Sequence, residues 1–195
     1  MLRSNLNTIN ARIFNKTAIR IDDQALREVE ACYRFLEKFE QGKVIYGINT
    51  GFGPMAQYRI GDADLNSLQY NIIRSHSCGA GEALPDICVR AAMLARLQTF
   101  LNAKSGVHPD VVRILADFLN NEIYPLVPRH GSVGASGDLV QLAHIALALI
   151  GGMGWASWYT HRKGKVVWNI VLLSTTMILI GFSSYASVTI RAAAN

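Results

Sequence analysis

The sequence predicts an all-α fold, and three observations lead to that prediction. Half of the 195 residues are hydrophobic, which is enough to build a core in a chain of this length. In several segments the apolar residues recur at the spacing of one helix face, and no segment shows the alternation of a half-buried strand. Aspartate, proline and glycine stand between these segments, where helices begin and end.

The first predicted helix follows Asp22 and Asp23, either of which can cap its N-terminus. Its apolar positions recur every three or four residues and therefore share one face: Leu26, Val29, Tyr33, Leu36 and Phe39. A glycine-rich stretch, residues 46–53, interrupts the helical pattern and is expected to form a loop.

The second and third predicted helices are bounded by aspartate, proline and glycine. Asp62 or Asp64 is expected to begin the second helix, which ends near Gly79. Its apolar face consists of Leu65, Leu68, Ile72 and Ile73. Pro85 suits the first turn of the third helix, residues 86–103, because that turn leaves backbone N–H groups unpaired in any case.

Pro109 begins the fourth predicted helix. Its apolar face consists of Val112, Leu115 and Leu119. A second glycine-rich stretch, residues 131–138, separates it from a fifth helix, residues 139–150, which is apolar nearly all round and therefore expects burial. We expect residues 1–150 to form one helical region and residues 151–195 to form a divergent apolar tail.

The segment after Ile150 differs in composition. The net charge is +5, yet all 14 acidic residues lie within residues 1–138, so the excess charge belongs to the tail and does not indicate a nucleic-acid partner. The uncharged run 166–190 follows the basic stretch 161–165 and is long enough to cross a bilayer. Two explanations stay open for residues 151–195: a membrane-spanning segment, and a product of a shifted reading frame, which the loss of acidic residues favours.

The three cysteines, Cys32, Cys78 and Cys88, have no metal-like spacing, and we expect them to be reduced and mostly packed. No metal site is predicted. The first six residues contain no apolar run that could serve as a signal peptide. The body of the protein is therefore expected to be cytoplasmic.

The 131–138 loop matches neither of two common glycine-rich motifs. It lacks the lysine and hydroxyl ending of a P-loop, and no predicted strand precedes it. Ser136 is not flanked by glycines in the pattern of a hydrolase nucleophile elbow. Without further information, such a loop is interpreted as a tight turn.

The motif Gly134-Ala-Ser-Gly-Asp-Leu139, followed by an apolar helix that contains His144, resembles the signature of the histidine, phenylalanine and tyrosine ammonia-lyases. The resemblance implies that the Ala135-Ser136-Gly137 tripeptide cyclises by itself. The backbone nitrogen of Gly137 would attack the carbonyl of Ala135, and loss of two waters would leave a methylidene-imidazolone. No external cofactor is implied. Glycine suits this reaction because no side chain hinders its nitrogen.

Two further segments resemble the same family. Residues 46–53 are similar to its N-terminal catalytic loop, which implies that Tyr46 is the base that removes the substrate's β-proton. Such a base needs its phenolate favoured by positive charge or hydrogen-bond donors. The glycines of this loop suit a mobile lid. The resemblance also implies that the pair Ser75–His76 faces the ring of the substrate.

The resemblance implies an ammonia-lyase, which acts on a small amino acid and forms a homotetramer in its full-length members. A Ser–His pair is similar to histidine lyases, so L-histidine, giving urocanate, is the expected substrate. Residues 138–142 read Asp-Leu-Val-Gln-Leu, which resembles bacterial lyases that include tyrosine-specific members, so L-tyrosine, giving coumarate, stays an alternative.

A third alternative is a non-enzymatic remnant, truncated or attached to a membrane by the tail. The family motifs end near residue 150, so we expect the chain by itself to be inactive. Four polar residues are interpreted as structural rather than catalytic: Arg74, His108, His130 and His144.

Overall fold

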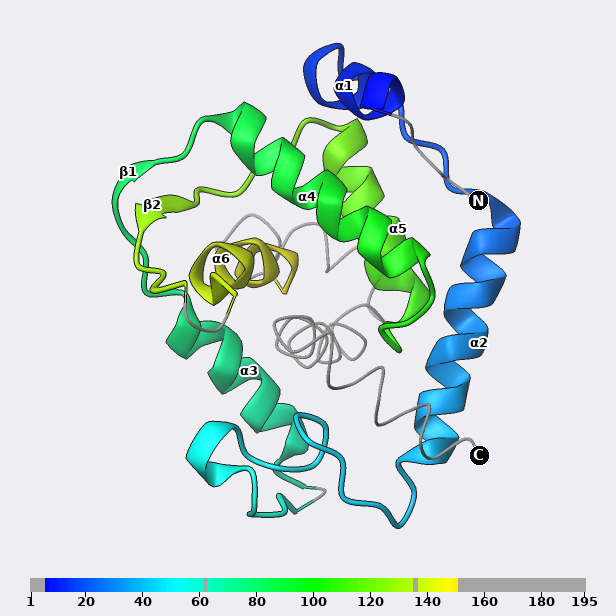
Figure 1. The fold of residues 1–195 in the computed structure, drawn as a ribbon, viewed down its shortest axis with the longest axis vertical. Helices are drawn as coiled ribbons and strands as arrows, with labels where there is room; N and C mark the ends of the chain where they lie inside the picture. Colours follow the sequence, from blue (N-terminus) through cyan, green and yellow to red (C-terminus); the bar gives the residue numbers. More distant parts are fainter. Residues whose placement is uncertain (1–5, 62, 135–136, 151–195) are drawn as a thin grey trace.

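The computed structural model of the protein describes residues 6–150, except residues 62, 135 and 136 (Figure 1). These residues form the helices α1 (Leu6–Phe14), α2 (Asp23–Phe39), α3 (Leu65–His76), α4 (Asp86–Leu101), α5 (Pro109–Asn120) and α6 (Leu139–Leu149), the 3-10 turn η1 (Gly53–Met55) and the short strands β1 (Ala80–Ala83) and β2 (Pro128–His130). The mostly helical architecture confirms the predicted all-α fold. The small sheet and α1 are additions that the sequence pattern did not predict.

Helix boundaries fall close to the proline and aspartate positions. Asp22 occupies the N-cap position of α2, and Asp64 that of α3, although neither side chain makes a capping hydrogen bond. α3 ends at His76, earlier than the predicted end near Gly79. The difference has a physical reason, because the residues that follow leave the helix to pair as β1.

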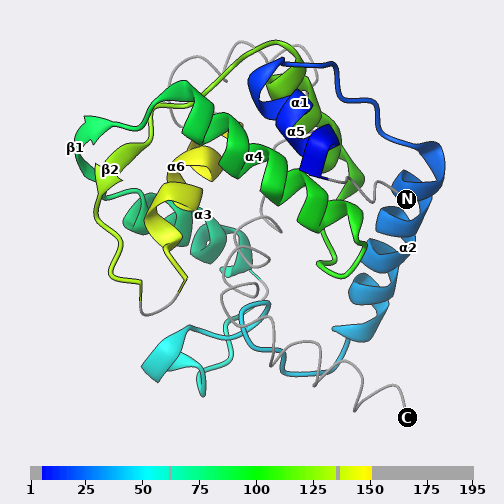
Figure 2. The same ribbon diagram turned by 45° about the horizontal axis from the view of Figure 1, so that its top comes forward.

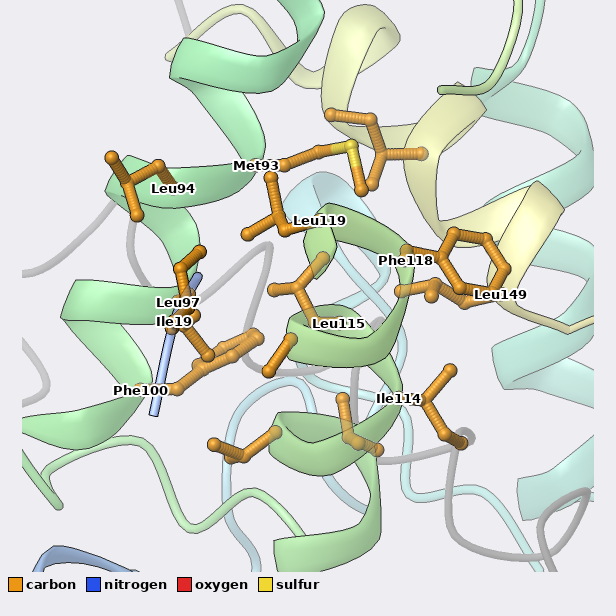
Figure 3. Packing of buried hydrophobic residues seen from close by; sticks show 14 of the residues in the cluster. Ile19, Met93, Leu94, Leu97, Phe100, Ile114, Leu115, Phe118, Leu119 and Leu149 are labelled. Carbon is orange, nitrogen blue, oxygen red and sulfur yellow. The ribbon is translucent and has the colours of Figure 1, made fainter. Parts of the chain in front are cut away.

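The main core lies between α4 and α5, and buried residues of α2 and α6 pack against it. Figure 3 shows part of this core, including Leu149 from α6. Among its most deeply buried side chains are Met93, Leu97 and Phe100 from α4 and Leu115 and Leu119 from α5. The apolar spacing of the two helices brings these residues to one interface, where burial of apolar surface stabilises the fold.

A buried arginine explains how α1 joins this core. Arg90 on α4 is 1% exposed, and its Nε donates to the Arg12 carbonyl oxygen at 2.7 Å. Its Nη1 donates to the Leu119 carbonyl at 2.8 Å and to the Tyr124 hydroxyl at 2.9 Å. Because a buried charge must be hydrogen-bonded, Arg90 connects α1, α4 and the end of α5.

The second half of the fold consists of α3, α6 and the sheet (Figure 2). β1 and β2 pair antiparallel, with Ala80 opposite His130 and Ala83 opposite Pro128. α6 packs on α3, where Ile73 and Ala146 are buried. Within the described residues no helix is long and apolar enough to cross a membrane, and the run 166–190 lies outside them.

Candidate active site

The loop before α6 turns sharply at its glycines. The backbone is left-handed at Gly134, Gly137 and Asp138, with φ of 74°, 88° and 53°. Glycine adopts such angles without strain, and aspartate tolerates them better than most residues. Ala135 and Ser136 lie outside the described residues. A glycine at 137 in a sharply turned loop fits a ring closure through its backbone nitrogen, so the residues present are compatible with the implied tripeptide chemistry.

Tyr46 lies in a loop with its own network of hydrogen bonds. The Gly53 N–H donates to the Tyr46 hydroxyl oxygen at 3.2 Å, and the Phe52 ring packs edge-on against Tyr46 with centroids 5.8 Å apart. A backbone donor favours negative charge on the oxygen that it contacts. This contact provides the kind of donor that a tyrosine base requires.

Two buried side chains shape the Tyr46 loop from within. The Asn49 Oδ1 accepts from the Ile45 N–H at 2.7 Å, and the Thr50 Oγ1 accepts from the Gly47 N–H at 3.2 Å. A Cβ atom at Gly51 would lie 2.6 Å from the Met55 carbonyl oxygen, so this position requires glycine. Closure of the loop over a substrate stays a prediction.

Ser75 and His76 occupy the last turn of α3. The His76 Nδ1 lies 2.9 Å from the Ile72 carbonyl oxygen, and the Ser75 Oγ donates to the same carbonyl at 3.1 Å. A carbonyl oxygen can only accept, so Nδ1 carries the ring proton in this contact. This contact engages Nδ1 within α3, so Nε2 is the ring nitrogen that would meet a ligand.

The end of α3 meets the start of the 131–138 loop. A Cβ atom at Gly131 would lie 3.1 Å from the Gly79 Cα and 3.6 Å from the Cys78 carbonyl oxygen. The structure therefore places the segment just after Ser75–His76 beside this loop. Tyr46 belongs to the loop that precedes the other end of α3, which begins at Leu65.

Three of the four polar residues interpreted as structural are histidines, and each makes a contact within the fold. The His108 Nδ1 accepts from the Asp110 N–H at 3.1 Å and so caps α5. The His144 Nε2 accepts from the Gly79 N–H at 3.1 Å. A Cβ atom at Gly81 would lie 2.9 Å from the His130 Cδ2, so this ring packs closely on β1. The Gly79–His144 contact was not predicted, because no sequence signal links residues so far apart.

The cysteines correct one expectation. All three are free, as predicted, but Cys78 and Cys88 are exposed and only Cys32 is partly buried, so the expectation that they are mostly packed is wrong. Both exposed residues stand just outside the apolar faces, Cys78 beyond the end of α3 and Cys88 in the first turn of α4. In the described part of the chain, no cluster of three or more metal-ligating side chains occurs.

Known proteins similar to this chain point to the same family. The family model described as "Aromatic amino acid lyase" matches residues 5–169, a range that contains every predicted site residue. The histidine ammonia-lyase of Bacillus cereus (strain ATCC 10987 / NRS 248) is 46% identical over 151 residues, which cover 77% of this chain and 29% of that relative. The chain thus spans less than a third of the relative's length.

Two solved structures have a similar fold. The phenylalanine aminomutase of Pantoea agglomerans superposes with a TM-score of 0.70 at 30% identity, covering 75% of this chain and 28% of that one. The histidine ammonia-lyase of Trypanosoma cruzi superposes with a TM-score of 0.63 at 31% identity, covering 74% of this chain and 27% of that one.

Proposed function

This chain belongs to the aromatic amino acid lyase family, and from that premise we propose that it carries the N-terminal catalytic region of a histidine ammonia-lyase. The reaction is the non-oxidative elimination of ammonia from L-histidine to give urocanate. The observation that carries this proposal is the 46% identity to a histidine ammonia-lyase over 151 residues.

The geometry of His76 supports a substrate whose ring offers a hydrogen-bond donor. With the Nδ1 proton directed to the Ile72 carbonyl, Nε2 accepts from the imidazole N–H of histidine or from the phenol O–H of tyrosine. The phenyl ring of phenylalanine offers neither. Elimination from L-tyrosine to give coumarate is therefore the second candidate, and the segment 138–142, which resembles a group of bacterial lyases that includes tyrosine-specific members, favours it.

Ala135, Ser136 and Gly137 would form the methylidene-imidazolone, which supplies an electrophile that makes ammonia a better leaving group. Gly137 has no side chain to hinder its nitrogen, and its left-handed backbone, with φ of 88°, is one that glycine adopts without strain. These residues precede the N-terminus of α6, whose partial positive charge favours developing negative charge.

Tyr46 is the proposed base. Its phenolate oxygen, which the Gly53 N–H contacts, takes the proton from the substrate's β-carbon. The electron pair of that C–H bond forms the new double bond, and the bond between the α-carbon and nitrogen breaks to release ammonia. Ser75 and His76 orient the ring during this step.

We further propose that the protein acts in the cytoplasm, within a homotetramer, and that residues 151–195 derive from a shifted reading frame. The family resemblance supports the first two statements, and the loss of acidic residues after Asp138 supports the third, although the family model extends to residue 169. A carbonate wash of cell membranes tests the rival membrane attachment, because only a spanning segment keeps the protein in the pellet.

The mass of the purified protein tests the proposed chemistry directly. If the tripeptide cyclises, the intact chain weighs two waters less than its sequence and absorbs in the near ultraviolet. Ser136→Ala should abolish both signals, while Ser132→Ala, in the same loop but outside the tripeptide, should keep them. A wild-type chain of full mass would contradict the proposal.

The substrate is tested in a chimera in which residues 1–150 replace the matching part of the Bacillus cereus histidine ammonia-lyase. We expect kcat/KM to be highest for L-histidine, measured by the absorbance of urocanate. A higher value for L-tyrosine, followed as coumarate, would favour the second candidate.

A further inference from the structure

His144 makes a hydrogen bond that joins two distant segments of the chain. It lies on α6, and its Nε2 accepts from the backbone N–H of Gly79 at 3.1 Å. Gly79 follows α3 and directly precedes β1, and 65 positions separate the two residues along the sequence. The bond therefore connects α6 to the segment that follows Ser75 and His76.

The surroundings of this bond are too tight for any residue but glycine. A Cβ atom at Gly79 would lie 2.9 Å from the Pro128 Cβ and 3.0 Å from the His144 Nε2. On the other side, a Cβ atom at Gly131 would lie 3.1 Å from both the Gly79 Cα and the Val140 Cγ1. Gly79 is thus in close contact with both His144 and Gly131.

The contact also defines the state of the imidazole. Because the Gly79 N–H is a donor, Nε2 must have a lone pair, and the proton of the neutral ring is on Nδ1. Burial holds the pKa of His144 below its usual value, which keeps the ring in the neutral form that the contact requires.

We propose that His144 is a positioning residue that, through Gly79, fixes the start of the 131–138 loop relative to Ser75 and His76. Gly131 is the first residue of that loop, and its contact with Gly79 depends on where the Gly79 backbone is held. The consequence for catalysis rests on the proposed function: because Gly131 begins the loop that would form the electrophile, loss of the His144 bond should impair the maturation of that loop.

Amide hydrogen exchange on the full chain tests the contact without any assay of activity. His144→Leu removes the acceptor, and we expect the Gly79 amide to exchange about five-fold faster or more, as loss of one hydrogen bond implies. His144→Gln places an amide oxygen near the position of Nε2 and should restore the wild-type rate. Gly79 exchange that is unchanged in His144→Leu, or not restored in His144→Gln, would overturn the proposal.

A control variant and a second measurement distinguish loss of this hydrogen bond from general unfolding of the protein. Gln141→Leu makes a comparable substitution on the same helix, at a side chain whose Oε1 has no hydrogen-bond partner in the described part of the chain, and should leave Gly79 exchange unchanged. If His144→Leu does not fold, nitrogen NMR of the wild-type protein still decides: we expect the proton of His144 on Nδ1. A proton on Nε2 would exclude the contact.

The effect of His144 on the 131–138 loop is measured by how many chains complete the cyclisation of residues 135–137. We expect the fraction of chains that have lost two waters to fall in His144→Leu and to recover in His144→Gln. If wild-type chains lose no water, the proposed function fails while the exchange test of His144 stands. If they mature and His144→Leu matures equally well despite faster Gly79 exchange, the positioning role is wrong.

Discussion

At the last turn of α3, two hydrogen bonds set what His76 can offer to a ligand. The Ile72 carbonyl lies 2.9 Å from Nδ1, and the Ser75 Oγ lies 3.2 Å from the same nitrogen. Both contacts involve the side of the ring that faces its own helix, so Nε2 is the atom left to accept from a substrate. Without this acceptor, the N–H or O–H group of a polar substrate ring would be buried without a hydrogen bond, which weakens binding by about 1–3 kcal/mol.

We therefore predict that His76→Phe, made in the chimera described above, lowers kcat/KM for histidine and tyrosine roughly five- to 150-fold and raises the relative preference for phenylalanine. Asn71→Ala, on the exposed face of the same helix, is the control and should leave all three values unchanged. Unchanged turnover of both polar substrates in His76→Phe would mean that His76 does not contact the ring.

The N-terminus of α5 is capped by a titratable side chain. The His108 Nδ1 accepts from the Asp110 N–H, and its ring packs edge-on against Tyr33 at 4.8 Å. Burial lowers the pKa of His108, and the Asp110 carboxylate, 3.7 Å from Nδ1, opposes that shift without outweighing it. Arg113 lowers the pKa of His108 further, whereas more distant glutamates on α2 raise it.

This depressed pKa predicts that stability falls with acidification. Below pH 6.5 the unfolded chain binds a proton at His108 before the folded chain does, so the stabilisation present above pH 6.5 is lost as the pH falls toward the folded pKa. His108→Asn keeps a capping acceptor and removes the titration. Its Tm should therefore change less than the wild-type Tm between pH 7.5 and 5.5; equal changes would show that another group is responsible.

The connection between α1 and the rest of the fold depends on Arg90. Lysine cannot reproduce the guanidinium bonds to Arg12, Leu119 and Tyr124, so Arg90→Lys should lower the free energy of unfolding by about 2 kcal/mol or more. Arg34→Lys, at an exposed ion pair on α2, should change it by less than about 0.5 kcal/mol. Urea unfolding gives the free energy of unfolding of both variants. Similar losses in the two would contradict the prediction that the buried hydrogen bonds of Arg90 stabilise the fold.

At the scale of the whole molecule, the described residues assemble only part of the proposed site. The segment after Ser75 and His76 contacts the start of the 131–138 loop, and Ala135 and Ser136 lie outside the described residues. The chain also corresponds to 29% of the length of its histidine ammonia-lyase relative.

We accordingly predict that the purified 195-residue chain forms the electrophile but releases no measurable urocanate or coumarate. The match covers 29% of the length of the histidine ammonia-lyase relative, and elimination requires a complete site that holds the substrate in position. Absorbance assays with L-histidine and L-tyrosine test this. Turnover in the wild-type chain that disappears in Tyr46→Phe would show instead that this part of the fold suffices.

Local patterns in the sequence were sufficient to predict most of the helices. α2, α4, α5 and α6 each combine an apolar face with proline, aspartate or glycine at their ends, and both signals come from residues close together in the chain. The tripeptide at 135–137 and the pair Ser75–His76 are short consecutive motifs, and their roles stay predictions that rest on the resemblance of these motifs to the lyase family.

Only the tertiary structure decided the features that depend on distant residues. β1 reads Ala-Gly-Glu-Ala, which shows no strand pattern, and it exists because β2 pairs with it from 45 or more positions away. α1 depends on Arg90, and the contact of Gly79 with His144 and Gly131 depends on how α6 packs on α3. The energy of such contacts depends on residues that are neighbours in space but distant in sequence, so a local sequence pattern cannot predict them.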